Sequence, residues 1–209
     1  VKKYIQDLGV RLARHSSRPD MPYDFEVIDE KEANAFALPG GFIYVHRGIF
    51  ALSENESELG GVLAHETAHV VARHSVEQIK RAQALGLGLG VLELVLGGDR
   101  NTAENLGALA ANIVAQGVYF KYSRDAETEA DRVAVRVLRD VGINPRGMIS
   151  LFQRMENLQD ERPSLVGDFF SSHPNLSERR RNIRDLLRDS DSRLRMDTRR
   201  FHEVRGQLR

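Results

Sequence analysis

Residues 65–69 read His-Glu-Thr-Ala-His, and this stretch decides how the rest of the chain is interpreted. On an α-helix, side chains four residues apart project about 40° from one another, so His65 and His69 can face one metal ion. Glu66 is rotated by about 100° from His65, which places its carboxylate beside the ion, where it can take a proton from water. The spacing therefore predicts a zinc site.

The flanking sequence favours a buried helix around this motif. Residues 59–64 and 70–72 are mostly apolar, whereas a chance match on a solvated helix would show charge on one face. Ser53 followed by Glu56 matches a capping box, which predicts one helix over residues 54 to about 81. Because two buried histidines without a ligand would be costly, the apolar surroundings favour the metal site.

A catalytic zinc site needs a third protein ligand and leaves a fourth position for water. The chain has no cysteine, so the ligands must be His, Asp or Glu. In the extended pattern His-Glu-x-x-His-x-x-Gly-x-x-His, the Gly and the last His would fall at Ala72 and Ser75. His74 is one residue out of register, so this pattern does not supply the ligand and His74 is interpreted as structural.

A later acidic segment offers the other route. Residues 123–131 contain Glu127 and Asp131 on one face of an expected helix. This spacing lets Glu127 bind the metal while Asp131 orients a histidine ligand and fixes its tautomer. A solvated acidic helix face is the alternative interpretation. Glu129 competes as a ligand, but it lies about 160° from Asp131 around the helix, so we choose Glu127.

The composition limits the remaining interpretations. With 209 residues, one domain over residues 1–209 is expected. Lys plus Arg and Asp plus Glu are both 30, so no overall field favours nucleic acid. The Arg-rich C-terminal segment, residues 189–209, follows arginines that are interleaved with acids, and this also argues against nucleic-acid binding.

Local patterns predict helices separated by short strands. Helical spacing at Tyr4, Ile5, Leu8 and Leu12 predicts an opening helix. The other expected elements are strand-like runs at 25–28, 33–38 and 42–45, a hairpin turn at 39–41, helices from Ser123 to near Gly142, from Asn144 onward and from Ser177 to about 188, a loop at 172–174, and a lid that could be mobile over 84–120.

Several of these segments together resemble a known family. They are residues 34–37 with 39–41, residues 65–70 with 73–74, residues 123–131, and residues 173–174 with Arg179. The chain resembles, over residues 25 to 185, the gluzincin metallopeptidases of HtpX, CAAX-prenyl-protease and mitochondrial inner-membrane quality-control type, peptidase family forty-eight. The resemblance implies an α+β, mostly α fold: a zincin-like (minigluzincin) domain with a small β-sheet and a central active-site helix.

The same resemblance implies the chemistry. One Zn²⁺ per chain would be bound by His65, His69 and Glu127, with Glu66 as base and Asp131 supporting a ligand. The expected function is that of a zinc-dependent endopeptidase acting on extended or misfolded protein segments in cell-envelope quality control. The alternative is a chaperone-like or latent binding module with a gated or structural zinc site.

Two later residues are expected near the metal by resemblance. His173 would act as a gate or fourth ligand, or would stabilise the transition state; the alternative is a loop histidine that caps the next helix. Arg179 could anchor that loop or stabilise an oxyanion, and the alternative is a solvated arginine.

Residues 42–46 resemble the edge strand along which substrate is laid. An extended peptide added there would be held by main-chain hydrogen bonds. The expected substrate-binding residues are therefore Gly41, Phe42, Ile43, Tyr44 and Val45.

The resemblance also bears on location. Membrane-embedded members carry long hydrophobic spans, whereas the most apolar stretch here, residues 84–98, contains five Gly and Glu93 and is too short to cross a bilayer. The chain resembles the soluble, periplasmic branch in the bacterial cell envelope, which leaves peripheral membrane contact and the oligomeric state open. Because the sequence begins at Val1, we expect that a targeting segment was removed.

Overall fold

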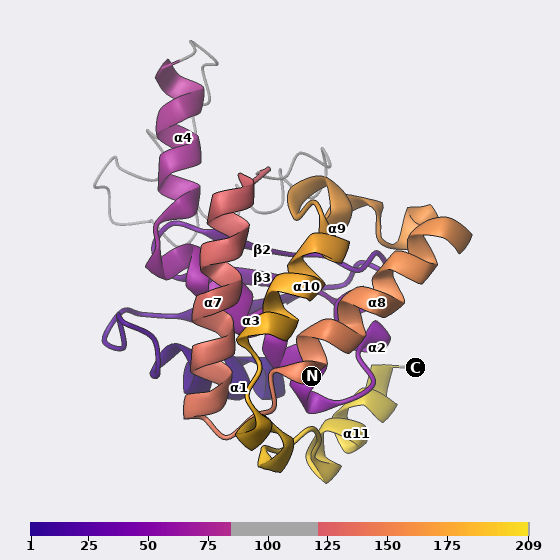
Figure 1. Ribbon diagram of the computed structural model, residues 1–209. Helices are drawn as coiled ribbons and strands as arrows, with labels where there is room; N and C mark the ends of the chain where they lie inside the picture. The colour runs from indigo at the N-terminus through magenta and orange to yellow at the C-terminus, as the bar shows by residue number, and fades with distance from the viewer. Residues whose placement is uncertain (85–120, 209) are drawn as a thin grey trace.

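The computed structural model describes residues 1–84 and 121–208 (Figure 1), so the lid expected over residues 84–120 lies outside the described residues except for its first position. Helices predominate and three short strands form one sheet in these ranges, which confirms the α+β, mostly α prediction. The elements are α1 Lys2–Ala13, β1 Asp24–Ile28, β2 Ala35–Leu38, β3 Phe42–His46, α2 Arg47–Leu52, α3 Glu56–Val71, α4 His74–Ala84, α7 Arg124–Asp140, α8 Arg146–Glu161, α9 Gly167–Ser172, α10 Leu176–Leu186 and α11 Arg199–Arg205, with 3₁₀ turns at Pro163–Leu165, Asp189–Arg193 and Gly206–Leu208.

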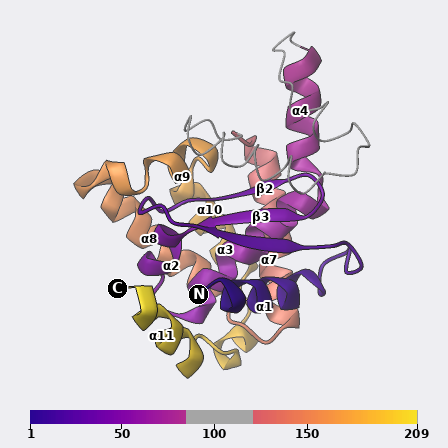
Figure 2. The same cartoon turned by 180° about the vertical axis from the view of Figure 1, so that it is seen from behind.

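The histidine motif lies on α3, the central helix of the fold. α3 is buried almost throughout, from Glu56 to Val70. It lies between α1 and the sheet on one side and α7 and α8 on the other, with α10 packed across these last two (Figures 1 and 2). A helix covered on all sides can be apolar on every face, as the sequence around residues 65–69 indicates.

Close packing against α8 fixes the position of α3. A side chain at Gly147, in the first turn of α8, would overlap Ser57 and the backbone of Glu58 on α3. Glycine therefore allows the two helices to approach closely here. The Ser57 hydroxyl donates to the carbonyl of Asn144, just before α8, so the contact is polar as well as steric.

The start of α3 differs from the prediction. Asn55, not Ser53, is the N-cap, and its side chain accepts a hydrogen bond from Glu58 N at 3.0 Å. The Ser53 hydroxyl instead donates to Ile49 O at the end of α2, at 2.8 Å. The predicted capping box is therefore wrong by two residues, because either side chain can serve as a cap and the preceding helix uses Ser53.

The end of this helix also differs. The single helix predicted over residues 54 to 81 is two helices, α3 and α4, separated at Ala72 and Arg73. Arg73 has φ +60°, in the left-handed region, which interrupts the run of helical hydrogen bonds. Apolar periodicity continues through Val76 and Ile79, and no glycine marks the break, so the pattern could not locate it.

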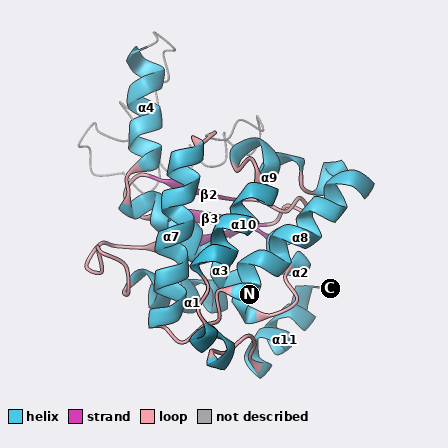
Figure 3. Ribbon diagram, in the orientation of Figure 1, coloured by secondary structure: helices cyan, strands magenta, loops and turns pink. Residues whose placement is uncertain are grey.

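The sheet has the strand order β1-β3-β2. Figure 3 shows β2 and β3 lying behind the helices. β2 and β3 pair antiparallel, with Phe36 opposite Tyr44, which confirms the predicted hairpin. Its turn contains Gly41 at φ +97°, a conformation that favours glycine. β1 pairs parallel with β3 on the other side, with Phe25 opposite Ile43.

This order corrects the predicted substrate strand. β3 is the central strand and is paired on both sides, so Phe42, Ile43, Tyr44 and Val45 cannot accept an added strand. The prediction that residues 42–46 form the edge strand is wrong, because β1 inserts beside β3 and local sequence does not encode strand order. Among the described residues, the edge strand packed on α3 is β2.

The later helices begin and end near the predicted positions. Ser123 caps α7 by accepting a hydrogen bond from Ala126 N at 3.2 Å, and Gly142 follows the helix at φ +77°. Residues 1–84 and 121–208 include no helix that is both long and apolar enough to cross a bilayer.

A buried carboxylate ties α3 to α8. Glu58 is paired with Arg154 at 2.7 Å and accepts a hydrogen bond from the Ser150 hydroxyl at 2.7 Å. Burial alone would raise the pKa of Glu58, but the hydrogen bonds from Arg154, Glu54 N and Ser150 outweigh it and lower the pKa below its ordinary value.

We predict that Glu58→Gln lowers the free energy of unfolding by about 2 to 3 kcal/mol at pH 7, because charge-assisted hydrogen bonds are lost. A lowered folded-state pKa stabilises the fold above the unfolded-state pKa, about 4.3, and this contribution disappears as pH falls through the folded-state value. Urea unfolding should therefore show the two proteins converging below about pH 4. Glu203→Gln, at the exposed Arg199 pair, is the control and should change little. A Glu58→Gln deficit that is the same at every pH would contradict the electrostatic explanation.

Candidate metal centre

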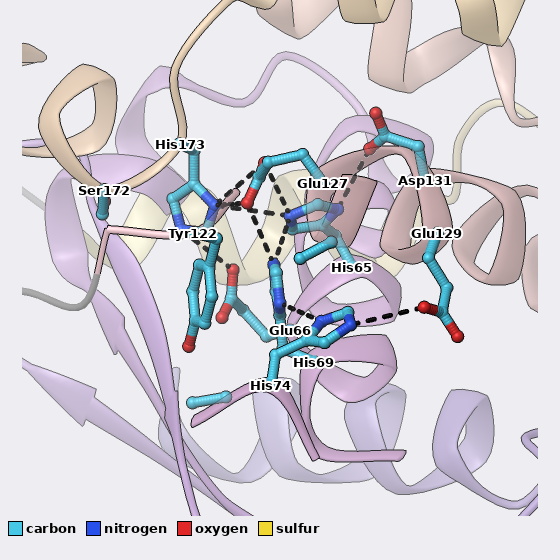
Figure 4. A network of polar contacts seen from close by, with 12 residues as sticks. His65, Glu66, His69, His74, Tyr122, Glu127, Glu129, Asp131, Ser172 and His173 are labelled. Carbon is cyan, nitrogen blue, oxygen red and sulfur yellow. Dashed lines mark hydrogen bonds and ion pairs between the residues drawn. The ribbon is translucent and has the colours of Figure 1, made fainter. Parts of the chain in front are cut away.

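Four buried side chains from three parts of the chain converge in the interior of the fold. His65 and His69 come from α3, Glu127 from the first turn of α7, and His173 from the residue that ends α9 (Figure 4). One ligand atom from each lies within 4.8 Å of the others. The structure therefore brings together the two histidines and the glutamate that the sequence selected, together with the loop histidine.

The distances fit a shared cation. The Nε2 atoms of His65 and His69 are 2.9 Å apart, and Glu127 Oε1 lies 3.3 Å from His69 Nε2. Glu127 Oε2 lies 3.5 Å from His65 Nε2. Two imidazoles and one carboxylate are the donor set of many catalytic zinc sites. The residues present therefore fit a zinc ion.

Glu66 lies beside this cluster and does not contribute a ligand atom to it. It is fully buried, and neither carboxylate oxygen accepts a hydrogen bond from a described residue. His173 Nε2 lies 3.5 Å from Glu66 Oε1. Burial raises the pKa of Glu66, although the charges of His173 and His65 oppose the shift. A buried carboxylate with unused acceptors suits a general base.

His65 is oriented by a carboxylate that is itself held by an arginine. His65 Nδ1 is 3.0 Å from Asp131 Oδ1, which leaves Nε2 directed at the cluster. Arg179 donates to both oxygens of Asp131, at 2.8 and 2.7 Å, and its Nη1 lies 2.6 Å from Glu127 Oε2. Arg179 is therefore buried and positions the two acids on α7. The alternative interpretation of Arg179 as a solvated arginine is wrong.

These contacts set the charges of the buried groups. Burial alone would raise the pKa of Asp131 and of Glu127, but the Arg179 guanidinium holds both pKa values below their ordinary range. Burial and Arg179 lower the pKa of His65, yet Glu127 and Asp131 outweigh them and raise it to about 9. Since a metal ligand must be deprotonated, an ion would displace this proton.

The second histidine is supported by residues that sequence reasoning did not assign to the site. His69 Nδ1 is 2.8 Å from His74 Nδ1, and His74 Nε2 is 3.5 Å from Glu129. Tyr122 stacks on the His69 ring, with centroids 3.8 Å apart and planes at 17°. Glu129, the competing ligand, is largely exposed and contacts His74 rather than the cluster. On sequence alone, His74, five residues after His69, is interpreted as structural. No sequence signal identifies Tyr122 as a residue of the site.

His173 points into the cluster and not toward the helix that follows it. Its Nδ1 lies 3.1 Å from Glu127 Oε1 and 3.4 Å from His65 Nε2. The N-cap of α10 is Asn175, so the structure does not support the interpretation of His173 as a helix cap. The position agrees with a fourth ligand or a gate.

Comparison with known proteins identifies the family. A family model described as "Peptidase family M48" matches residues 1–187. The chain belongs to this family. The buried cluster and the mostly helical fold with a small mixed sheet agree with a zincin-like M48 metalloendopeptidase domain.

Curated relatives of the M48 chain include proteases from bacteria and mitochondria. It is 32% identical over 186 residues to the mitochondrial metalloendopeptidase OMA1 of Schizosaccharomyces pombe, covering 88% of this chain and 52% of that protein. It is 33% identical over 158 residues to the beta-barrel assembly-enhancing protease of Escherichia coli, and this match covers 73% of this chain and 32% of that protein. It is 31% identical over 167 residues to the metalloprotease YcaL of Escherichia coli, and this match covers 79% of this chain and 63% of YcaL. The chain thus spans about a third to under two thirds of these relatives.

We predict that Glu127→Gln weakens zinc binding by more than about 100-fold, whereas Asp131→Asn weakens it by about 10- to 100-fold, as expected for an outer hydrogen-bond partner. Asp125→Asn, on the same helix but exposed, is the matched control and should bind zinc normally. Competition with a fluorescent chelator measures the dissociation constants. Undiminished zinc binding by Glu127→Gln would show that a residue other than Glu127 is the third ligand.

Proposed function

We propose that this chain is a zinc-dependent endopeptidase that hydrolyses peptide bonds in extended or misfolded protein segments, in cell-envelope protein quality control of a bacterium. The observation that carries the proposal is the convergence of His65, His69 and Glu127 next to Glu66, whose two oxygens accept no hydrogen bond from a described residue.

In this proposal His65, His69 and Glu127 hold one Zn²⁺ per chain. When bound, zinc supplies Lewis acidity to the peptide carbonyl and to water. Asp131 keeps His65 in the tautomer that leaves Nε2 free for the metal, and His74 constrains His69. The ligands are therefore positioned before the metal arrives.

Glu66 is the proposed general base. It accepts the proton of the attacking water and later delivers a proton to the amide nitrogen as the C–N bond breaks. The surrounding burial supports this role because a carboxylate without hydrogen-bond donors binds a proton more readily.

The proposed substrate strand is β2, the edge of the sheet next to α3. His46 N donates to Asn34 O at 2.9 Å, so the alternation of the antiparallel ladder directs the main-chain groups of Ala35 and Ala37 away from β3. The Ala37 carbonyl already accepts a hydrogen bond from Ser75, at 2.7 Å. An extended peptide added along this edge would pass the metal centre, and main-chain bonding would give broad specificity.

The relatives support the proposed location and role. One is named for assisting β-barrel assembly in Escherichia coli and another for its mitochondrial location. Since this chain spans only part of each, their complete activities are carried over here only as a proposal.

We predict that Glu66→Gln retains zinc but cleaves unfolded casein about 10²- to 10⁴-fold more slowly, the range typical of losing a general base. Metal analysis and a fluorescent casein assay test both halves of this prediction. Asp125→Asn, an exposed acid on α7, should cleave at the rate of the parent. Equal rates for parent and Glu66→Gln would exclude the mechanism.

The position of His173 favours a second candidate, a latent form of the same site. A side chain 3.1 Å from Glu127 can take the fourth position on the metal, which otherwise admits water. A chain held in that form would bind partners without cleaving them, as a chaperone-like module would.

We predict that His173→Ala retains zinc and cleaves casein several-fold faster than the parent, because removal of the imidazole opens the fourth position. Slower cleavage with unchanged zinc content would instead assign His173 to the chemical step. The ratio of initial rates, with metal content measured on the same samples, separates these results.

A further inference from the structure

A cavity beside the metal centre has no role in the chemistry described above. It has a volume of about 450 Å³ and lies between the hairpin turn that ends β2 and the start of α4. Buried His69 and Ser75 form its deep end, while exposed Arg73 and half-buried Arg18 lie toward solvent. Its other lining residues are Met21, Pro22, Leu38, Pro39, Gly40, Val70 and Val76.

The charge of this cavity is one-sided. Arg18 and Arg73 both line it, and neither guanidinium forms an ion pair or hydrogen bond with a described residue, whereas Arg11, Arg47, Arg154 and Arg179 each pair with an acid. No Asp or Glu is among the described lining residues. The pocket therefore combines an apolar wall with positive charge, which complements a side chain that has methylene groups and a carboxylate.

Arg73 occupies a conformation that a larger residue rarely adopts. Its φ of +60° places it where a helix end usually has Gly or Asn. The left-handed conformation is unfavourable for a residue that carries a Cβ atom. The Arg73 side chain is exposed, and no residue of the described ranges forms an ion pair or hydrogen bond with its guanidinium. Its position at the pocket does supply a reason for a long cationic side chain.

The pocket is aligned with the proposed substrate edge. Leu38 ends β2 and lines the pocket, and Ser75 lines it while bonding the outward carbonyl of Ala37. His69 belongs to both the pocket and the metal cluster. A peptide lying along β2 across the metal centre would therefore pass this pocket within a few residues of the cleaved bond.

We propose that this pocket is a specificity subsite for an acidic substrate residue, Glu or Asp, with its carboxylate between Arg18 and Arg73 and its methylene groups against the apolar wall. This inference rests on the proposed function, because it names the substrate class of the same site. A basic residue at that position is disfavoured by the same charges. A peptide's terminal carboxylate has the same chemistry and must be distinguished by experiment.

The binding test uses the 209-residue Glu66→Gln chain with zinc, so that peptides bind without being cleaved. Labelled peptides with amidated ends differ only in carrying Glu, Gln or Lys, moved in turn through the positions flanking one cleavage site, and fluorescence anisotropy gives each dissociation constant. At one position we expect Glu to bind about 3- to 10-fold more tightly than Gln, with Lys weakest. The preference should shrink as salt is raised.

Substitutions then assign the preference to the arginines. Arg18→Gln and Arg73→Asn should each reduce the Glu-over-Gln ratio about two- to fivefold, and Arg73→Lys should retain most of it because the charge remains. Asn also tolerates the left-handed conformation, so Arg73→Asn should fold. Arg14→Gln, an exposed arginine outside the pocket lining, is the matched control and should leave the ratio unchanged.

The outcomes separate this inference from the proposed function. If the parent cleaves casein but no position prefers Glu, or if Arg18→Gln and Arg73→Asn keep the full preference, the subsite proposal is wrong while the peptidase proposal stands. Tighter binding of a Gln peptide with a free terminal carboxylate than of the amidated Glu peptide would assign the pocket to chain ends and overturn the proposal. If the parent cleaves no protein and the Glu66→Gln protein binds no peptide, the proposed function itself fails.

Discussion

The structure depends on the buried guanidinium of Arg179. Glu66, Glu127 and Asp131 bring three carboxylates into an interior that also holds His65, His69 and His173. Such groups are costly to bury without partners. Arg179 donates to both oxygens of Asp131, lies 2.6 Å from Glu127, and stacks over the Phe152 ring at 4.6 Å. One cation thus compensates two acids of α7, while no residue in the described part of the chain donates a hydrogen bond to Glu66.

This arrangement requires α3, α7 and α10 to be held in a fixed relation. At the start of α3, Glu56 accepts hydrogen bonds from Tyr4 at 2.6 Å and Thr198 at 2.7 Å and pairs with Arg11 and Arg195. The first helix and the C-terminal segment are thereby joined to the end of α3 opposite the metal centre. At the other end, His74 and Ser75 connect α4 to His69 and to β2. Ligand positions are consequently determined by contacts far apart in the sequence.

The break after α3 links structure to substrate recognition. If the helix continued without interruption, residues 74 and 75 would follow the helical path of α3. The left-handed Arg73 changes the direction of the chain, so that His74 supports His69, Ser75 reaches Ala37, and Arg73 itself faces the cavity beside β2. A single strained residue therefore connects the metal centre, the edge strand and the proposed acidic-residue subsite.

By itself, the sequence determined the features that depend on neighbouring residues. The helical spacing of His65, Glu66 and His69, the four-residue spacing of Glu127 and Asp131, the Ser123 cap and the hairpin at residues 39–41 all follow from local geometry. It also determined the mostly helical class. Only the tertiary structure decided that β3 is central and β2 is the edge, that the helix breaks at Arg73, and that Arg179, His74 and Tyr122 surround the ligands. These features depend on long-range packing, in which one local pattern is compatible with several partners, so the choice among them is made by burial and charge compensation in the folded chain.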